Sequence, residues 1–388
     1  MVSTRWLALV SSWLAWFWSH GTRVGVSAIT PFIRERMSLS IAEASALPGL
    51  LNLGFYTSNI MSGQIARTLG YGRAVAVGAI GASALFAISS QLGEKILFYA
   101  VMAAVGLFLA LHLPSAIPWV SSLFDARRRG FFIGVHESAA PAGQTLGPII
   151  LTLLIVSVGL AAAMPLWAIA SVAAGSAALL VGNGQILKNG GRIGRVAGSG
   201  LSRLTILSFV VLTTGMLVGN LGVVAIVPLY LVESVGLDKS LVAALVGLSR
   251  ILGVLGQPLG GILYDRLGFF KVVSVITAAN ILSSAYIAYG PYNPIYVAMM
   301  VAQATSTAMY FPIFYSHIVH LSGERAGIAI GRIISVSGLI GPTSAPLVAG
   351  YLAETYNHQV ALTYPLVMIL LAIPVLSVSR GLGLSQPE

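Results

Sequence analysis

Three arginines and one glutamate interrupt long apolar stretches of this sequence. They are Arg23, Glu137, Arg250 and Arg332. An arginine at the centre of a membrane-spanning helix costs about 2.5 to 3.5 kcal/mol on insertion scales, so such a residue is expected to have a function. A guanidinium that faces water inside a protein can hold a carboxylate or a phosphate through two parallel hydrogen bonds. These residue types therefore indicate a binding site for an anion.

Arg23 and Arg250 are the residues that we expect to hold this anion, one from each half of the chain. Two alternatives stay open: Arg23 could extend outward to the membrane surface beside Arg34, and Arg250 could pair with Glu137 or a backbone carbonyl. Further polar or imidazole side chains in the apolar spans could complete the pocket, or could serve helix packing. They are His20, Asn52, Tyr56, Asn220 and Tyr310.

Glu137 and His112 are the residues that we expect to carry a proton. A carboxyl in a low-dielectric site favours its neutral form, whereas a nearby arginine favours ionisation, so the arrival of a substrate can change its proton affinity. The imidazole of His112 titrates near neutral pH and could relay a proton. The alternatives are a permanent ion pair of Glu137 with Arg332 or Arg127, and a packing role for His112.

Membrane-spanning helices are the elements that must position these residues. Of the 388 residues, 57% are hydrophobic and only 8% are charged, against about 25% charged in soluble domains. So little charge excludes a soluble enzyme, a soluble nucleic-acid-binding protein and a disordered scaffold. A helix crosses the hydrocarbon core with about 20 apolar residues, which predicts an all-α membrane protein. We find twelve such stretches, at residues 6–29, 46–66, 73–91, 96–121, 131–157, 159–181, 205–231, 241–263, 271–290, 295–319, 327–349 and 360–379.

The orientation of the chain explains its net charge of +10. Lysine and arginine concentrate in the cytoplasmic loops of membrane proteins. Most of the basic residues lie at the two termini and in alternate loops, and the opposite loops hold only Arg34, Arg36, Lys95 and Lys239. We therefore expect a multi-pass protein of the plasma (inner) membrane with both termini in the cytoplasm. No nucleic-acid partner is expected.

The chain also repeats itself across a glycine-rich basic linker. We expect an N-terminal six-helix bundle at 1–181, a cytoplasmic linker at 182–203 and a C-terminal six-helix bundle at 204–388. Residues 63–73 follow the second span much as residues 261–271 follow the eighth. Two related bundles with a substrate site at the midplane are a recurring plan of secondary transporters.

At the second copy of this repeat the sequence resembles the major facilitator superfamily. The matching residues of that superfamily's G-x-x-x-D-R-x-G loop are Gly261, Asp265, Arg266 and Gly268. The resemblance implies two pseudo-symmetric six-helix bundles, alternating access, and a cytoplasmic gate at this loop. The first copy carries Arg67 where the acid is expected, and we place Arg67 and Arg332 in the same gate.

Two branches of the superfamily share further residues with the chain. The first span and the loop after it resemble the anion:cation symporters and, more broadly, organic anion transporters, through Arg5, Arg23 and the segment 31–40. The fifth span resembles drug:proton antiporters through a G-x8-G-x3-G-P spacing at Gly134, Gly143, Gly147 and Pro148. The first resemblance implies an anionic substrate and the second implies drug efflux.

The function that we expect is proton-coupled secondary transport of a small anion, an organic carboxylate. No G-x-x-x-x-G-K-[ST] loop and no nucleophile with a base indicate an enzyme. Efflux of a drug in exchange for protons is the alternative, and a non-transporting receptor of the same fold is a third possibility. No histidines and acids have metal-ligand spacing, so no metal or other cofactor is expected, and His136 and His317 receive little weight. The expected partners are the anion, protons and lipids, and the expected working unit is a monomer.

Overall fold

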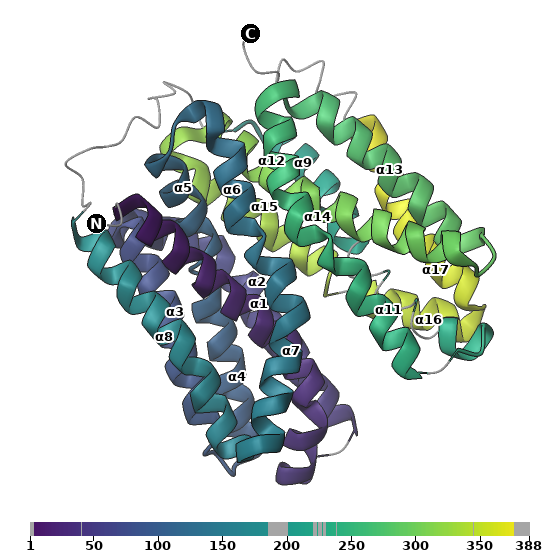
Figure 1. Ribbon diagram of the computed structural model, residues 1–388, viewed down its shortest axis with the longest axis horizontal. Helices are drawn as coiled ribbons and strands as arrows, with labels where there is room; N and C mark the ends of the chain where they lie inside the picture. Colours follow the sequence, from purple (N-terminus) through teal and green to yellow (C-terminus); the bar gives the residue numbers. More distant parts are fainter. Residues whose placement is uncertain are drawn as a thin grey trace. The chain divides into compact units, whose positions relative to one another are not determined.

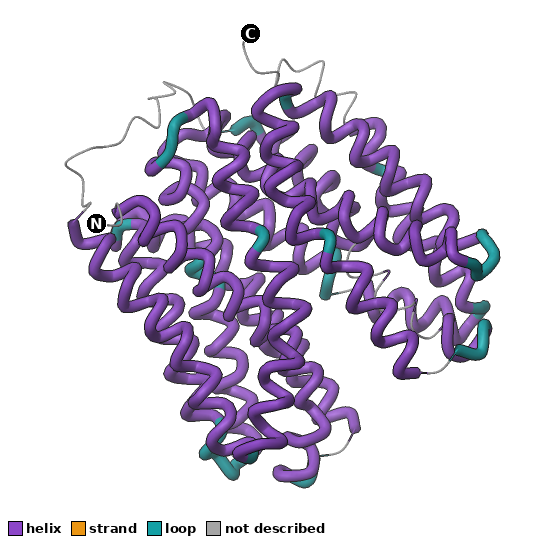
Figure 2. The backbone as a smooth tube through the Cα atoms, in the orientation of Figure 1, coloured by secondary structure: helices purple, strands orange, loops and turns teal. Residues whose placement is uncertain are grey.

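The computed structural model describes residues 4–39, 41–184, 201–219, 223, 227, 230–237, 239–343 and 345–375. Every regular element in this part of the chain is a helix (Figure 2). The all-α fold expected from the composition is confirmed. Most of the linker expected at 182–203 lies outside the described residues.

The helices follow one another with short connections (Figure 1). Those of the first half are α1 (Thr4–Met37), α2 (Ile41–Leu69), α3 (Tyr71–Ser89), α4 (Lys95–Leu109), α5 (Leu113–Leu123), the 3₁₀ turn η1 (Ala126–Arg128), α6 (Arg129–Glu137), α7 (Ala139–Val158) and α8 (Leu160–Gly184). Those of the second half are α9 (Arg203–Leu217), the π turn η3 (Tyr230–Ser234), α11 (Lys239–Ile251), α12 (Gly253–Leu267), α13 (Phe269–Tyr289), α14 (Pro294–Ser322), the 3₁₀ turn η4 (Gly323–Arg325), α15 (Ala326–Ile340), α16 (Ala345–Thr355) and α17 (His358–Leu370).

Many of these helices are long and apolar enough to cross a membrane. Within the described residues there are 7 such helical stretches: Tyr71–Ser89, Lys95–Leu123, Ala126–Val158, Leu160–Gly182, Phe269–Tyr289, Pro294–Ile340 and His358–Val375. The stretch Pro294–Ile340 alone, at 47 residues, contains the expected span 295–319 and the first part of the expected span 327–349. The protein is thus a multi-pass membrane protein, and twelve spans are consistent with these stretches.

Four of the expected spans are interrupted where the sequence predicted continuous helices. The fourth span is divided between α4 and α5 before Pro114, and the fifth between α6 and α7 before Pro141. The eighth is divided between α11 and α12 at Leu252, and the eleventh between α15 and α16 at Pro342. Proline has no N–H to donate to the carbonyl four residues earlier, and its ring crowds that carbonyl. Two of these breaks hold titratable side chains, because His112 precedes α5 and Glu137 ends α6.

The chain forms two compact units, each of which includes a short segment from the other half of the sequence. Unit 1 consists of Met1–Ala126, Val135–Gly198 and Ile318–Ser335. Unit 2 consists of Arg127–Gly134, Ser199–His317 and Val336–Glu388. The domain limits expected from the sequence, 1–181 and 204–388, stay a prediction.

Each unit has its own packed interior. In unit 1, α1 packs against α7 and α8, and α3 packs against α8 (Figure 1). The core there is rich in alanine, with Ala15, Ala76 and Ala178 among its buried residues. Small side chains let helix backbones approach closely, which is how membrane helices gain packing energy. In unit 2, Tyr296 and Leu362 belong to a second buried cluster.

Each unit contains a close contact between two glycines, at places that correspond in the internal repeat. In unit 1, a Cβ added to Gly63 of α2 would meet the backbone of Gly327 in α15. In unit 2, a Cβ added to Gly261 of α12 would meet the backbone of Gly130 in α6. Both contacts require glycine, because any side chain would force the two backbones apart.

Candidate functional site

The guanidinium of Arg23 in α1 is held by two side chains of α2. Its Nε donates to Oδ1 of Asn52 at 3.0 Å, and its Nη2 donates to the same oxygen at 2.8 Å. Nη2 also donates to the hydroxyl of Tyr56 at 3.1 Å, and the Cζ atom lies 4.0 Å from the centre of the Phe55 ring. Three residues predicted for one site thus lie together. Phe55 is a fourth member that the sequence analysis missed, although it precedes Tyr56 directly.

Arg23 has only neutral partners in the part of the chain that the structure describes. The side chain is half-buried. The amide oxygen of Asn52 orients the planar fork of donors, and the face of Phe55 stabilises the cation through its ring quadrupole. Neither of these neighbours carries a charge that would cancel that of the guanidinium, so an anion could still neutralise it.

His20 lies one turn before Arg23 on α1. Its Nδ1 is 3.0 Å from Nε2 of Gln144 in α7, and its ring meets the ring of Trp16 edge-on at 4.3 Å between centroids. It also interacts electrostatically with both Arg23 and His136. His20 is therefore within electrostatic reach of the Arg23 site and of a second polar group in the same unit.

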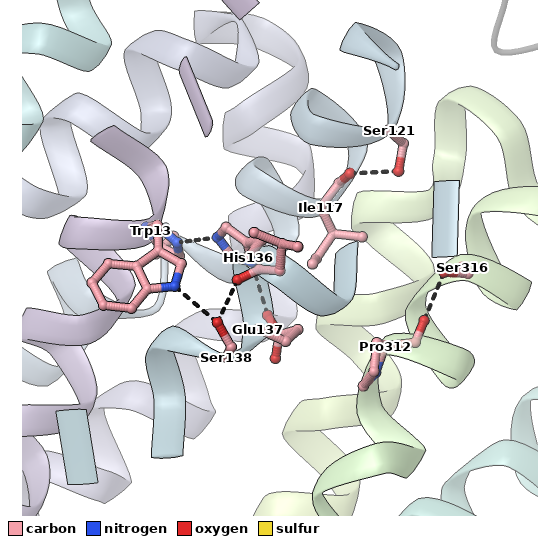
Figure 3. Close-up of polar contacts among 10 residues, drawn as sticks. Trp13, Ile117, Ser121, His136, Glu137, Ser138, Pro312 and Ser316 are labelled. Atoms are coloured by element: carbon pink, nitrogen blue, oxygen red, sulfur yellow. Dashed lines mark hydrogen bonds and ion pairs between the residues drawn. The ribbon is translucent and has the colours of Figure 1, made fainter. Parts of the chain in front are cut away.

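This second group is a buried chain of three titratable side chains. Nε2 of His112 is 3.1 Å from Nε2 of His136. Nδ1 of His136 is 3.0 Å from Oε1 of Glu137 (Figure 3). All three are at most 3% exposed. The two residues predicted to carry a proton are thus joined through His136, to which the sequence analysis gave little weight.

The helix break after α6 helps to position this chain. His136 and Glu137 are consecutive residues, yet their side chains are bonded to each other at the end of α6. Ser138 follows them and accepts a hydrogen bond from Nε1 of Trp13 at 3.0 Å (Figure 3). Among the described residues Glu137 forms no ion pair with Arg332, one of the pairings that the sequence left open, and Arg332 is exposed.

Trp16 covers the two imidazoles. Its ring lies nearly parallel to that of His112, with 6° between the planes and 4.9 Å between centroids, and at 16° and 6.4 Å to that of His136. Trp16 and Trp18 are buried, whereas Trp6 is 41% exposed. Of these three tryptophans of α1, only Trp6 is therefore available to contact lipid.

The predicted residues of unit 2 are more scattered. Arg250 is half-buried in the last turn of α11. Tyr310 of α14 is fully buried, its hydroxyl is 2.8 Å from Oγ1 of Thr213, and its ring stacks on Phe314. These contacts are typical of helix packing. Asn220 lies outside the described residues.

A buried polar group in unit 2 escaped the sequence analysis. Nδ2 of Asn280 in α13 donates to Oγ1 of Thr307 at 2.6 Å, and Nε2 of Gln303 in α14 donates to the carbonyl of Gly219 at 2.5 Å. Asn280 and Gln303 are both buried. The signal that could have found them is an amide side chain inside an apolar span, the same signal that identified Asn52.

Two of the residues expected to form a gate, Gly261 and Asp265, contact the start of α6. The carboxylate of Asp265 in α12 accepts hydrogen bonds from the backbone N–H groups of Gly130 at 2.9 Å and Phe131 at 3.0 Å. A carboxylate at a helix N-terminus satisfies donors that have no partner within the helix and interacts favourably with the helix dipole. Burial raises the pKa of the Asp265 carboxyl, while these two hydrogen bonds and the charge of Arg129 oppose the rise.

The other expected gate residues lie at the ends of α2 and α12 and in α15. Gly268 has a φ of 77° and lies between α12 and α13, and Gly70 has a φ of 89° between α2 and α3. Arg266, Arg67 and Arg332 are exposed. Their roles in a gate stay a prediction.

No metal site is apparent in the described residues, where His, Cys, Asp and Glu do not gather in groups of three or more that could hold an ion. The buried imidazoles of His112 and His136 have the carboxylate of Glu137 beside them, but one imidazole nitrogen faces the other at hydrogen-bond distance. This arrangement suits the sharing of a proton between the two rings. A proton between the two Nε2 atoms occupies the lone pairs that would otherwise bind a metal ion.

Comparison with known proteins gives the family. The model of the Major Facilitator Superfamily matches residues 6–331 and again residues 204–382. The chain belongs to the Major Facilitator Superfamily. It is therefore a membrane transporter of this superfamily and not an enzyme, and the Asp265 contact lies in its G-x-x-x-D-R-x-G loop.

Several superfamily members are similar over nearly the whole chain. The protein named "Probable sulfoacetate transporter SauU" from Cupriavidus necator is 22% identical over 390 residues, covering 91% of this chain and 88% of that protein. The crystal structure of the human organic anion transporter MFSD10 matches with a TM-score of 0.69 at 18% identity, covering 97% and 98% of the two chains. The outward conformation of FucP matches with a TM-score of 0.69 at 16% identity, covering 98% and 99%. At such identities the structures share the fold.

Proposed function

We propose that this transporter carries a small organic anion across the membrane by alternating access. The observation that carries the proposal is the Arg23 site, where a half-buried guanidinium has only neutral partners among the described residues. An anion that reaches this site gains charge-assisted hydrogen bonds from a donor fork that Asn52 already holds in place. A pre-oriented fork loses less side-chain entropy on binding than a mobile one.

The names of two relatives support the same class of cargo. One is named for sulfoacetate, which carries a sulfonate and a carboxylate, and the other is an organic anion transporter. An anion with two charged groups could contact two arginines, so we propose Arg250 of unit 2 as the second contact. A ligand supports alternating access when it binds the states of the cycle with different affinity, and a second arginine is one source of such a difference.

We also propose that transport is coupled to protons through Glu137 and His112. Both are buried within unit 1, and His20 interacts electrostatically with Arg23 and with the neighbourhood of His112. An anion that neutralises Arg23 removes a positive charge from this neighbourhood. A proton then binds more readily, because the field that opposed it is weaker.

The remaining parts of the proposal concern location and gating. We propose a plasma (inner) membrane protein with both termini in the cytoplasm, which the distribution of basic residues supports. The contact of Asp265 with the start of α6 would then belong to a cytoplasmic gate. We propose a monomer as the working unit.

The first experiment measures ligand-induced thermal stabilisation of the purified protein in detergent. The panel contains monocarboxylates, dicarboxylates, sulfoacetate, inorganic anions and lipophilic cations. We expect stabilisation by organic anions that is lost in Arg23→Ala, because a ligand that binds only the folded protein raises its stability by mass action. Lys271→Ala, which removes an exposed charge, is the control and should keep the shift.

The second experiment measures uptake of the stabilising anion into proteoliposomes under an imposed pH gradient. Uptake driven by inward proton flow supports the whole proposal. Stabilisation by lipophilic cations alone would contradict it in favour of drug efflux. Binding of an anion without any uptake would contradict it in favour of a receptor.

A further inference from the structure

We infer that His136 joins Glu137 and His112 into one relay that takes up a single proton and passes it along its length. Only the role of this relay in transport depends on the proposed function. Its own evidence is the geometry of three side chains, and its test needs no substrate.

The three side chains are aligned for proton transfer. The two imidazole planes lie within 9° of parallel, with Nε2 facing Nε2 at 3.1 Å, and the far nitrogen of His136 faces Oε1 of Glu137 at 3.0 Å. A contact between two Nε2 atoms requires one donor and one acceptor, so a single proton lies between the rings. At the other end, Nδ1 of His112 is buried without a hydrogen-bond partner among the described residues.

This arrangement fixes the proton balance. With Glu137 ionised, His136 donates its Nδ1–H to the carboxylate and His112 donates its Nε2–H to His136. A proton that binds Nδ1 of His112 releases the Nε2 proton to His136, and His136 releases its Nδ1 proton to Glu137. The relay gains one proton, both hydrogen bonds reverse direction, and no buried charge remains. No side chain has to move.

The surroundings couple this proton to the anion site. Of the neighbouring elements, α1 contributes His20 and Arg23, and α7 contributes the neutral Gln144 beside His20. The helix α12, which packs against α6, contributes Asp265 at the start of α6. Arg23 interacts electrostatically with His20, which interacts with both imidazoles of the relay. Like charges repel, so the charge of Arg23 opposes the arrival of a proton in this group of side chains. An anion bound to Arg23 weakens this repulsion, so anion and proton favour each other's binding. The relay therefore predicts symport and not exchange.

The test follows the infrared band of the protonated Glu137 carboxyl after a rapid drop in pH, in purified protein without any anion. Glu137→Gln identifies the band. In His136→Gln, the amide can keep hydrogen bonds but cannot pass a proton on, so we expect the band to rise at least about tenfold more slowly than in the wild type. His112→Asn removes the point of entry and should slow the band similarly.

Two controls keep the result interpretable. His317→Gln removes a buried imidazole of unit 2 that is packed against Phe269, and it should keep the wild-type rate. Melting curves establish that each variant is folded. A folded His136→Gln protein whose Glu137 band rises at the wild-type rate would overturn the relay, and so would a wild-type Glu137 that takes up no proton. Absence of anion transport by the wild type would refute the proposed function and leave this result standing.

Discussion

At the scale of single residues, the charge of Arg23 is oriented without being cancelled. One oxygen of Asn52 receives two of the guanidinium's hydrogen bonds, and Tyr56 receives a third. A carboxylate in the place of that amide would hold the same geometry and add a permanent counter-ion. The neutral amide is what leaves the guanidinium attractive to an anionic ligand.

Substituting the α2 partners of Arg23 should therefore have graded effects. Asn52→Asp should abolish anion-induced stabilisation, because the new carboxylate pairs with Arg23 and competes with the ligand. Tyr56→Phe removes one hydrogen bond, worth about 0.5 to 1.5 kcal/mol, and should weaken anion binding by about tenfold or less. Isothermal titration of both variants with the anion found in the thermal screen measures these effects. An Asn52→Asp protein that binds the anion like the wild type would contradict this account.

The same residues show how far the sequence alone could lead. Arg23, Asn52 and Tyr56 could be assigned to one site from the sequence. Polar side chains are costly inside apolar spans, so each is expected to have a function. His136 could not be recognised as the link between Glu137 and His112. Consecutive residues point in different directions on a regular helix, and the sequence predicted the spans of His112 and Glu137 as continuous helices.

At the scale of elements, breaks and close contacts between helices position the site. Pro114 and Pro141 follow the ends of α4 and α6 and place His112 and Glu137 at interruptions of the backbone. The prolines could be read from the sequence, but whether a proline bends or divides a helix depends on packing. The repeated glycines were also visible. Their partners, Gly327 for Gly63 and Gly130 for Gly261, required the structure.

These glycine contacts should not tolerate a methyl group. Gly63→Ala and Gly261→Ala should each destabilise the protein by about 1 to 3 kcal/mol, because overpacking displaces a backbone that cannot yield as a side chain would. A Cβ on Gly49, in the same helix as Gly63, meets nothing within 4 Å. Gly49→Ala should therefore leave the melting temperature unchanged or raise it through better helix propensity. An equal fall in the melting temperature for Gly49→Ala and Gly63→Ala would refute this explanation.

The burial of the Asp265 carboxyl predicts a pH dependence of stability. Because burial raises the pKa of this carboxyl, the folded protein keeps its proton to a higher pH than the unfolded chain does. The resulting stability is complete in acid and is lost as the pH rises through the raised pKa. Between about pH 4 and pH 7, the melting temperature of the wild type should fall more steeply than that of Asp265→Asn. Asp125→Asn, at an exposed aspartate, should keep the wild-type slope, and a wild-type slope in Asp265→Asn would count against the raised pKa of Asp265.

At the scale of the whole molecule, each half of the chain carries an arginine within an apolar span, Arg23 in the first half and Arg250 in the second. The superfamily could be identified from the G-x-x-x-D-R-x-G loop, since the family match extends over nearly the whole chain. The substrate could not be identified from the sequence, because transporters of unrelated substrates share this loop and this fold. The choice of substrate therefore depends on the individual side chains that this common fold positions.

Whether both arginines act on one anion can be decided by a double-mutant cycle. If a single anion contacts both, removing either arginine loses part of the same binding energy. The loss in Arg23→Ala/Arg250→Ala should then be smaller than the sum of the single losses, with an interaction energy of about 0.5 to 3 kcal/mol. Dissociation constants of the three variants and the wild type, measured at one ionic strength, provide the cycle. Additive losses would mean that the arginines act independently, and the anion would then be held by Arg23 without help from Arg250.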